Sequence, residues 1–500
     1  MIELVWVSEM RNKKIIIYCF IVSLLVLLLA SKSSPLYPFN DWCDANAFFT
    51  MGKGLFNGKI IFKDLFEQKG PFLYLIYGIG YLISNTSFLG VFVLEVISST
   101  IFLYLTHKII NLYLEEKYSY IILPLFAFLL YTAISFRHGS SCEEFCFPMM
   151  MYSLYELIMY ARSNEISYKK IYIVGIMAGL IFLTKYTVLG INFAFMVCLF
   201  ISLLKEKNYK KAFISPFVYL AGMFTAIIPW IIYFGLNNAI KDFFNVYIFT
   251  NLFSYTKTKV NIFVKLINCF ICFSKNLYAN KLYITIIFAL LLLPLFSKRV
   301  NGREKAVITV SIVCSILFVY IGGIYFKYYI LPILIFMIFA LIYLVGLLSK
   351  LKLNKYMLIP YMIVILVLTY FVSPNTHFMK VKQKDLVQYK FKDIIMKKKN
   401  PTILNYGYLD MGFYTTTGIV PNTRYFEKLN FKYKKYPENV DELNKYIDNK
   451  EVDFVIYVTK GVEDFPKTES IGTTYKLVAH ERQRFEGRMF DYYLYELGEA

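Results

Sequence analysis

Long apolar runs constrain this chain more than any other feature, because about 20 consecutive apolar residues span the hydrocarbon core of a bilayer. The 500 residues are 58% hydrophobic, and the mean hydropathy of +0.51 is too high for a soluble globular protein of this size. The sequence therefore predicts an α-helical polytopic membrane protein with about eleven transmembrane helices. The predicted spans are 15–30, 88–106, 119–136, 145–161, 171–184, 186–204, 213–235, 281–297, 306–322, 328–349 and 356–373.

One shorter apolar run, residues 71–83, is left out of this count, and that choice decides the topology. It contains Gly78 and Gly80 and is too short to cross the bilayer, so we expect an interfacial or re-entrant helix. With this run outside the bilayer core, the loops on one side hold 19 Lys and Arg in 57 residues, and the loops on the other side hold 13 in 116. The positive-inside rule then predicts a multi-pass protein of the plasma membrane with a cytoplasmic N-terminus and an extracytoplasmic C-terminus.

The excess of basic residues fits the same class of protein. The chain has 54 Lys and Arg against 34 Asp and Glu, a net charge of +20, and in polytopic proteins such an excess collects in cytoplasmic loops. The lipid bilayer is therefore an expected partner and nucleic acid is not. The eight cysteines are scattered, mostly in or beside apolar runs, and lack a convincing set of His or Cys partners for a metal, so we expect them to pack as small hydrophobic residues.

The segment from Asn40 to Pro71 holds a concentration of charged residues that nothing else in the N-terminal half matches. It falls on the predicted outer face, together with the loop from Arg137 to Glu144 and with Lys185. Charged groups near a membrane are costly and usually functional, so this face is the predicted location of the chemistry. The charged residues of the first segment are Asp41, Asp44, Lys53, Lys59, Lys63, Asp64, Glu67 and Lys69.

The order of residues in this segment resembles that of the GT-C glycosyltransferases, polytopic enzymes that use lipid-phosphate-linked sugars. The most similar branch contains the protein O-mannosyltransferases and the lipid A aminoarabinose transferases. Its pattern is an early acid, an aromatic pair, a turn of small residues and a Pro step into a short interfacial helix. This chain has Asp44-Ala-Asn-Ala-Phe-Phe49, Gly58-Lys59 and Lys63-Asp-Leu-Phe-Glu-Gln-Lys-Gly-Pro71, and a second family acid corresponds to Glu143-Glu144. The resemblance covers about residues 10–260.

The resemblance implies a GT-C-like transmembrane domain over residues 1–373, in which 31–87 form the first extracytoplasmic catalytic loop with interfacial helices. The composition changes after Pro374, and residues 374–500 are expected to form a small extracytoplasmic α/β domain. Its sequence patterns predict helices over 380–399 and 437–448 and strands over 402–406, 453–458 and 490–495. Three residues of this domain are candidates for contact with the acceptor, although a turn and a salt bridge explain them as well: Asp410, Tyr414 and Arg424.

The resemblance also implies an activity. The chain is expected to be an inverting glycosyltransferase that moves a sugar from a polyprenyl-phosphate-linked donor to a hydroxyl group of a cell-envelope acceptor. Asp44 is then the general base, a role that contributes about 10²- to 10⁴-fold in rate. Lys69 is the first candidate for binding the donor phosphate, with Lys185 and Arg137 next, because a cation stabilises the charge that grows on a leaving phosphate. The further candidates for substrate or metal contact are Glu144, Glu143, Asp41 and Glu67.

No cofactor is identified by the sequence. Ala45 stands where the family commonly has Glu, which weakens the case for a metal-binding acidic pair, and Gly70-Pro71 replaces a Pro-Pro step. A divalent metal is therefore neither required nor excluded. The sugar and the acceptor are not identified either.

Structural interpretations of the same residues stay open. Asp44 can cap a helix by accepting hydrogen bonds from free amide groups, and acids such as Glu143-Glu144 are favourable at a helix N-terminus. Lys185 can extend its ammonium to the lipid headgroups, and Glu67 can pair with a neighbouring lysine.

Two other functional classes also stay open. A polymerase or ligase of a cell-surface glycan joins lipid-linked sugars and carries basic residues in a large later outer loop, of which 236–280 is a moderate version. A transporter is less well supported, because most predicted spans are uncharged apart from Glu95 and Glu156 and no internal repeat is evident.

Overall fold

The computed structural model describes residues 2–254, 261–297, 300–323, 325–348, 355–461 and 465–498. The chain forms two compact units, each assembled from segments that are far apart in the sequence. The first unit comprises Met1–Ser31, Leu94–Ile232 and Tyr255–Thr376. The second comprises Lys32–Val93, Tyr233–Ser254 and His377–Ala500.

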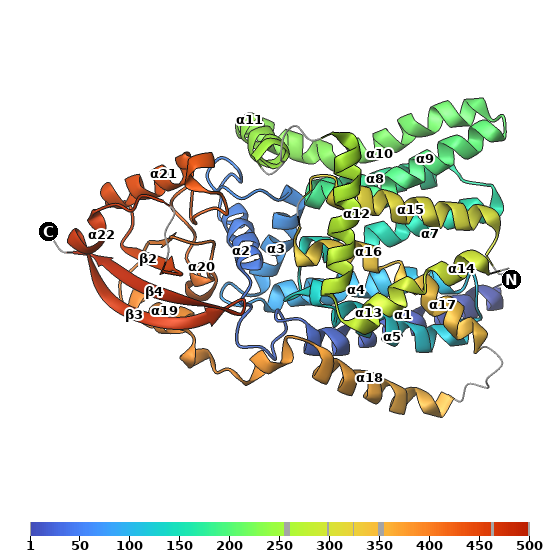
Figure 1. The fold of residues 1–500 in the computed structure, drawn as a ribbon, viewed down its shortest axis with the longest axis horizontal. Coiled ribbons are helices and arrows are strands. Elements are labelled where there is room, and N and C mark those ends of the chain that lie inside the picture. Colours follow the sequence, from blue (N-terminus) through green and yellow to red (C-terminus); the bar gives the residue numbers. More distant parts are fainter. Residues whose placement is uncertain are drawn as a thin grey trace. The chain divides into compact units, whose positions relative to one another are not determined.

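The first unit is a bundle of helices formed by the apolar runs, most of which lie side by side (Figure 1). Its helices are α1 (Ile2–Ala30), α4 (Leu89–Ile110), α5 (Ser119–Tyr131), α6 (Cys142–Phe145), α7 (Phe147–Ser163), α8 (Tyr168–Lys185), α9 (Gly190–Lys205), α10 (Tyr209–Leu236), α12 (Ile262–Ala279), α13 (Leu282–Ala289), α14 (Leu292–Phe296), α15 (Gly302–Tyr320), α16 (Leu331–Leu334), α17 (Met337–Leu347) and α18 (Leu358–Val372). Helices α4 and α10 extend by a few residues into the second unit.

Five helices of the described chain are long and apolar enough to cross a membrane, or six if the bent pair Lys327–Leu334 and Met337–Leu347 is one span. Four shorter apolar helices have 10–17 residues, and one of them is α3 (Pro71–Ile83), which has the bounds expected for the short interfacial helix. The predicted polytopic helical architecture is thus confirmed, while the number of eleven spans stays a prediction.

Helix α12 is a feature that the sequence analysis placed in a loop. Figure 1 shows it running across the neighbouring helices of its unit. It carries large exposed apolar side chains such as Phe263 and Tyr278, while Asn276 is buried and donates a 2.8 Å hydrogen bond to the hydroxyl of Tyr320. Lys265 and other polar residues interrupt its apolar positions, so that it lacks the continuous run by which spans are found in a sequence.

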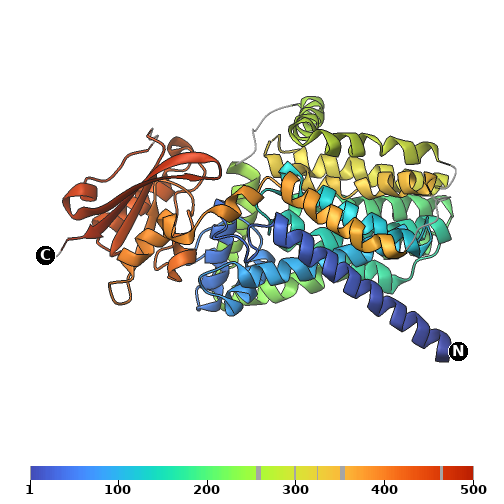
Figure 2. The same ribbon diagram turned by 90° about the horizontal axis from the view of Figure 1, so that it is seen from below.

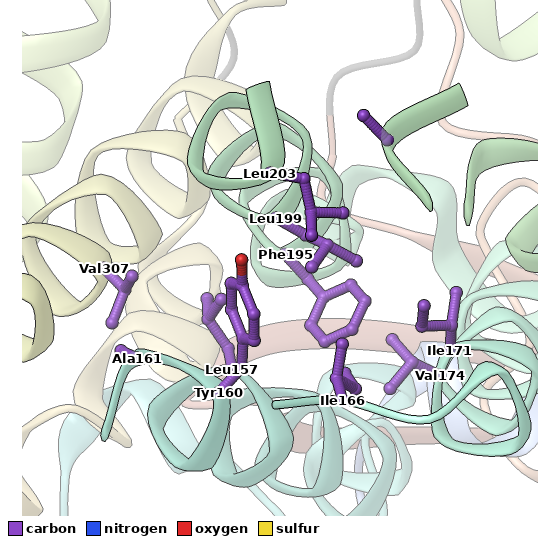
Figure 3. Packing of buried hydrophobic residues seen from close by; sticks show 11 residues of the cluster. Leu157, Tyr160, Ala161, Ile166, Ile171, Val174, Phe195, Leu199, Leu203 and Val307 are labelled. Carbon is purple, nitrogen blue, oxygen red and sulfur yellow. The ribbon is translucent and has the colours of Figure 1, made fainter. Parts of the chain in front are cut away.

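Part of the core of the first unit lies where α7, α8, α9, α10 and α15 meet (Figure 3). Phe195 of α9 packs here against Leu157 of α7 and Val174 of α8, and all three side chains are fully buried. The remaining members are Tyr160, Ala161, Ile166, Ile171, Leu199, Leu203, Ala212 and Val307. This contact holds α7 and α8 together. Helix α7 begins shortly after the loop from Arg137 to Glu144, and α8 ends at Lys185.

The second unit combines the first outer loop with the C-terminal region. Its helices are α2 (Cys43–Phe56), α3, α11 (Ile240–Phe243), the π-helix Phe244–Ser254, α19 (Val387–Ile395), α20 (Phe413–Thr417), α21 (Pro437–Asp448) and α22 (Ser470–Thr473). Helix α21 has the bounds predicted from the sequence. Helix α19 occupies the centre of the predicted stretch 380–399, whose first part forms two short 3-10 turns.

Helices α2 and α3 pack at very close range because glycines face each other. A Cβ atom added at Gly52 would lie 2.5 Å from the backbone nitrogen of Gly78 and 2.8 Å from the carbonyl oxygen of Tyr74. Pro71 begins α3 at the first helical position, where its missing N–H costs nothing. Gly78, one of the two glycines that made residues 71–83 a poor candidate for a span, is therefore a packing residue.

The C-terminal sheet has four strands in the order β1-β2-β4-β3. The strands are β1 (Ile403–Tyr406), β2 (Phe454–Thr459), β3 (Tyr475–Phe485) and β4 (Arg488–Leu497), with β1 parallel to β2 and the other pairs antiparallel. Figure 2 shows them in red as one twisted sheet. Glu486 and Gly487 join β3 to β4 with positive φ angles of 48° and 76°, which is the geometry of a two-residue hairpin turn. The three predicted strands are confirmed, and β3 is an addition.

Candidate active site

Asp44 lies in the first turn of helix α2, but it is not the N-cap residue of that helix. The N-cap position is Trp42, whose side chain makes no capping hydrogen bond. The free N–H of Cys43 is instead bound at 3.0 Å by Oε1 of Glu486, at the tip of the β3–β4 hairpin. Because another carboxylate caps the helix, the carboxylate of Asp44 is not needed for that purpose. A negative charge in a first helical turn is also electrostatically favourable.

The surroundings of Asp44 set it apart from its neighbours. From Phe39 to Gly54 every residue except Asp44 is buried. A charged side chain that keeps access to solvent within a buried segment can be reached by a ligand, whereas the buried charged side chains on either side cannot.

Asp41 is one of the buried charged residues beside Asp44. Its carboxylate is 2.5 Å from the ammonium of Lys32, and both side chains are less than one-tenth exposed. The ammonium also lies 4.4 Å from the centre of the Phe378 ring. This ion pair favours a structural role for Asp41 over contact with a substrate or a metal.

Lys69 and Glu67 form a second polar group in this unit. The carboxylate of Glu67 accepts hydrogen bonds from the backbone N–H of Lys69, at 2.8 Å, and from the hydroxyl of Tyr74. Burial, reinforced by this carboxylate, raises the pKa of Tyr74 well above its ordinary value, so the phenol remains a donor. The ammonium of Lys69 lies 3.6 Å from Glu67 and 5.5 Å from the centre of the Phe48 ring, and the side chain is 23% exposed.

A row of residues along α2 is bonded to the C-terminal region, the first through its backbone N–H and the other three through their side chains. The row consists of Cys43, Asn46, Thr50 and Lys53, which lie on one face of the helix because they follow each other at spacings of three and four residues. We call these residues the polar face of α2. Their partners are Oε1 of Glu486 at 3.0 Å, Oγ1 of Thr415 at 2.7 Å, Oδ2 of Asp410 at 2.7 Å and the carbonyl oxygen of Tyr414 at 2.7 Å, respectively.

The ionisable members of this contact have strongly shifted pKa values. Burial lowers the pKa of Lys53 to about 7, with the nearby carboxylate of Asp410 acting in the opposite direction. Burial raises the pKa of Asp410 to about 6, against the hydrogen bonds that it accepts from Thr50 and from the N–H of Gly412. Glu427 is also buried and accepts a 2.5 Å hydrogen bond from the N–H of Asp410; burial and the Asp410 carboxylate raise its pKa well above the ordinary value.

These contacts correct one expectation from the sequence. Asp410 and Tyr414 are completely buried, so neither side chain presents itself to an acceptor. Arg424 donates to the carbonyl oxygen of Phe62 at 3.3 Å and lies 3.6 Å from the carboxylate of Asp242. The residues of the C-terminal domain that were considered for acceptor binding thus hold the unit together.

In the first unit, the loop from Arg137 to Glu144 is fixed by two buried acids. The N–H of Ser140 donates to Oε1 of Glu95 at 2.9 Å and to Oε2 of Glu144 at 2.8 Å, and the hydroxyl of Ser31 donates to Oε2 of Glu95 at 2.7 Å. Burial and the neighbouring Glu95 raise the pKa of Glu144 well above its ordinary value. Gly139 has φ +89°, and a Cβ atom there would lie 2.2 Å from Oγ of Ser31, so only glycine fits.

Lys185 at the end of α8 is paired with Glu143 in the same unit. The ammonium contacts the carboxylate of Glu143, which is almost completely buried, and the Lys185 side chain is 11% exposed. It also lies 4.3 Å from the ring centre of Tyr329 and 5.2 Å from that of Tyr328. Two of the candidate residues from separate loops are therefore brought together. The two tyrosines beside them could not be singled out among the 44 tyrosines of the sequence.

Among the residues that the structure describes, no three His, Cys, Asp or Glu side chains are grouped so that they could hold a metal ion. The acids of this site are instead bonded to lysines, hydroxyl groups and backbone N–H groups. The chemistry that the described groups offer is proton transfer by a partly exposed carboxylate and charge stabilisation by a partly exposed ammonium.

Comparison with known proteins gives a family match and a fold match. Residues 68–234 match the family model described as dolichyl-phosphate-mannose-protein mannosyltransferase. No curated protein sequence matches the chain. The solved structures that match include ArnT from Cupriavidus metallidurans bound to undecaprenyl phosphate, with a TM-score of 0.59 and 12% identity over 94% of this chain and 97% of ArnT. Its apo structure matches with a TM-score of 0.58 and 12% identity over 98% of both chains. The fold expected from the sequence is thereby confirmed.

Proposed function

We propose that the chain is a membrane glycosyltransferase of the GT-C type, which transfers a sugar from a polyprenyl-phosphate-linked donor to a hydroxyl group of a cell-envelope acceptor. Two findings support this choice over a transporter or a glycan polymerase. The family model matched by residues 68–234 is that of a mannosyltransferase. The structure that shares the fold over nearly the whole chain was solved with undecaprenyl phosphate, a polyprenyl phosphate.

Asp44 is the proposed general base, and the observation that carries this assignment is its exposure. It is the one partly exposed residue between Phe39 and Gly54, in the first turn of a helix that Glu486 caps. A base must reach the acceptor hydroxyl, and a carboxylate that was buried or consumed by a cap could not. Asp41, which is paired with Lys32, lacks this access.

In the proposed reaction, the carboxylate of Asp44 takes the proton of the acceptor hydroxyl while the oxygen attacks the anomeric carbon. The bond between that carbon and the phosphate oxygen breaks, the polyprenyl phosphate leaves with the electron pair, and the configuration at the anomeric carbon inverts. No oxidant, reductant or further reactant is needed.

Lys69 is the proposed contact of the departing phosphate. Its ammonium is partly exposed and is 3.6 Å from Glu67, a distance longer than a charge-assisted hydrogen bond. Because the side chain is partly exposed, its ammonium can also reach a second anion. Glu67 is proposed to orient Lys69 through the backbone hydrogen bond. The assignments of Lys185 and Arg137 to the donor phosphate, and of Glu143 and Glu144 to the substrate, stay predictions.

The test is sugar transfer by the purified full-length protein from a panel of polyprenyl-phosphate sugars, with donor binding followed separately. We expect Asp44→Asn to reduce turnover by about 10²- to 10⁴-fold with donor binding retained. Asp64→Asn is the control, since Asp64 belongs to the same loop and its carboxylate binds the backbone N–H of Ile60. Full activity of Asp44→Asn would overturn the assignment of the base. Absence of transfer from every donor by the wild type would favour the polymerase or the transporter instead.

The assignment of Lys69 needs its own variant. Lys69→Gln should weaken donor binding and turnover together, because the ammonium contacts the phosphate both before and during its departure. Lys63→Gln is the matched control; this lysine of the same loop donates to the carbonyl oxygen of Asn237 and is exposed. Equal effects of the two substitutions would mean that the loop contributes only a general positive charge.

A further inference from the structure

A groove on the first unit is lined by apolar side chains together with Lys305 and Thr309. It lies between α13, α14, α15 and α17 and has a volume of about 280 Å³. Five positions of α15 line it at helical spacing: Lys305, Ile308, Thr309, Ile312 and Val313. At a rise of about 1.5 Å per residue this face is about 12 Å long. The other walls are contributed mainly by apolar side chains, among them Phe288 and Phe339.

The groove is open to the outside of the unit. Leu292 and Val313, which line it, are 62% and 41% exposed, whereas Phe339 on its floor is 3% exposed. An apolar groove open at the surface of a membrane helix bundle is filled by hydrocarbon, because water there would meet no polar partners. The volume lies just below the usual range for small-molecule sites, about 300–1,000 Å³, and suits a chain better than a bulky ring system.

Lys305 gives this groove a charged end. The adjacent acid, Glu304, is already paired with Arg162 at 2.7 Å, and Glu206 is paired with Arg303 at 3.7 Å. Within the described ranges of the chain, the ammonium of Lys305 makes no ion pair or hydrogen bond, and only its backbone N–H is bonded, to the carbonyl oxygen of Asn301 at 3.0 Å. Its positive charge is therefore not neutralised by those acids and is available to an anion at the end of the groove.

A second polar group lies beside the same groove. A smaller cavity of about 20 Å³ shares Pro294, Val300 and Phe339 with it and is also lined by Tyr113. The hydroxyl of Tyr113 is buried and has no hydrogen-bond partner among the residues that the structure describes. A phenol in this position can donate to an oxygen of a lipid headgroup.

We propose that this groove binds one anionic phospholipid, with an acyl chain along α15 and its phosphate at Lys305. The loop 298–305 contains four Lys and Arg and is assigned to the cytoplasmic side by the charge pattern. Basic residues at this level of a membrane protein recognise anionic headgroups of the inner leaflet. The same pattern assigns residues 31–87, which carry Asp44 and Lys69, to the opposite side. The lipid is therefore a separate ligand and not the sugar donor.

Native mass spectrometry of the full-length protein, released from nanodiscs of phosphatidylglycerol, phosphatidylcholine or an equal mixture, tests the proposal. We expect one phosphatidylglycerol to be retained in preference to phosphatidylcholine. Lys305→Gln should lower this preference about fivefold, and Thr309→Trp should remove the bound lipid by filling the groove from an exposed position. Lys205→Gln is the control, since Lys205 is an exposed lysine at the end of α9 that does not line the groove.

Three results would overturn the proposal. Equal retention of both phospholipids would exclude a role for charge, and unchanged retention by Lys305→Gln and Thr309→Trp would place the lipid elsewhere. Displacement of phosphatidylglycerol by undecaprenyl phosphate at equal concentration would identify the groove as part of a donor site. Thermal unfolding of each variant in detergent separates loss of the lipid from loss of the fold.

Discussion

The hydroxyl of Thr50 donates a 2.7 Å hydrogen bond to the carboxylate of Asp410, a residue 360 positions later in the chain. Thr50 belongs to the helix that carries Asp44, and Asp410 follows the first strand of the C-terminal sheet. The C-terminal region is thus bonded directly to the polar face of α2 and forms part of the same compact unit. In the proposed enzyme, its role is to hold the helix of the catalytic base.

Removal of this contact should destabilise the second unit. Asp410→Ala leaves two buried donors, the hydroxyl of Thr50 and the N–H of Gly412, without their acceptor, at a cost of about 1–3 kcal/mol for each. Thr50→Val removes one neutral partner of a charged group and should cost about 1.5–3 kcal/mol. Thermal unfolding of the purified variants measures both effects. Asp441→Asn, an exposed position on α21, should unfold like the wild type, and a comparable loss in that control would mean that the contact is not special.

The stability of the second unit should rise between pH 7 and pH 9. The pKa of Lys53 is lowered from 10.5 to about 7 by burial, so in this range the unfolded chain holds a proton that the folded chain has released. Stability then increases with pH, by about 2–3 kcal/mol over two pH units. Lys53→Met should abolish this rise when unfolding temperatures are measured across the range. An identical pH profile in the variant would show that Lys53 is not the titrating group.

Glu486 should matter to α2 as a cap supplied from the hairpin. Glu486→Ala removes the acceptor of the Cys43 N–H and is expected to cost about 0.5–2 kcal/mol, while Glu486→Gln keeps a carbonyl oxygen there and should cost less. Both variants should retain more transfer activity than Asp44→Asn, since neither removes the proposed base. Unfolding temperatures and turnover of the three variants, compared side by side, test this order. If Glu486→Ala were as inactive as Asp44→Asn, the assignment of Asp44 as the base would be contradicted.

Gly52 should tolerate no side chain. Gly52→Ala brings a Cβ atom within 2.5 Å of the backbone of Gly78, which cannot move as a side chain would, and overpacking of this kind costs about 1–3 kcal/mol. Gly54→Ala is the matched control on the same helix, because its nearest neighbour is the tip of the Leu65 side chain, which can rotate away. Unfolding of the two variants in detergent should differ clearly. Equal losses would point to helix flexibility and not to the contact with α3.

Much of the fold could be predicted from local patterns. Apolar runs and the charge of the loops indicated a helical membrane protein, and the short run with two glycines indicated α3 with correct bounds. Helix α21 and strands β1, β2 and β4 followed from their own periodicity. Strand β3 and helix α12 were missed, because each mixes charged and apolar residues: β3 contains His480, Arg482 and Arg484, all of which are exposed.

The candidate site was only partly predictable. Asp44 and Lys69 were found through a family resemblance, and the structure adds that Asp44 differs from Asp41 in exposure. The pairing of Lys185 with Glu143, and the burial of Lys53 against Tyr414, depend on contacts between segments 42 and 361 residues apart. No local pattern in the sequence encodes such a contact, so a surface lysine and a buried one look alike until the fold is known.

The assembly of the second unit from three separated segments also has a consequence for biosynthesis. Helix α2 leaves the ribosome early, but Asp410, Thr415 and Glu486, the partners of its polar face, are made last. Contacts of such long sequence separation form late, because the intervening chain must first be closed into a loop. A nascent or truncated chain therefore exposes Lys53 and its neighbours to water. The first loop acquires its final structure only when the C-terminal segment has been synthesised, so that completion of the whole chain is a condition for an ordered α2.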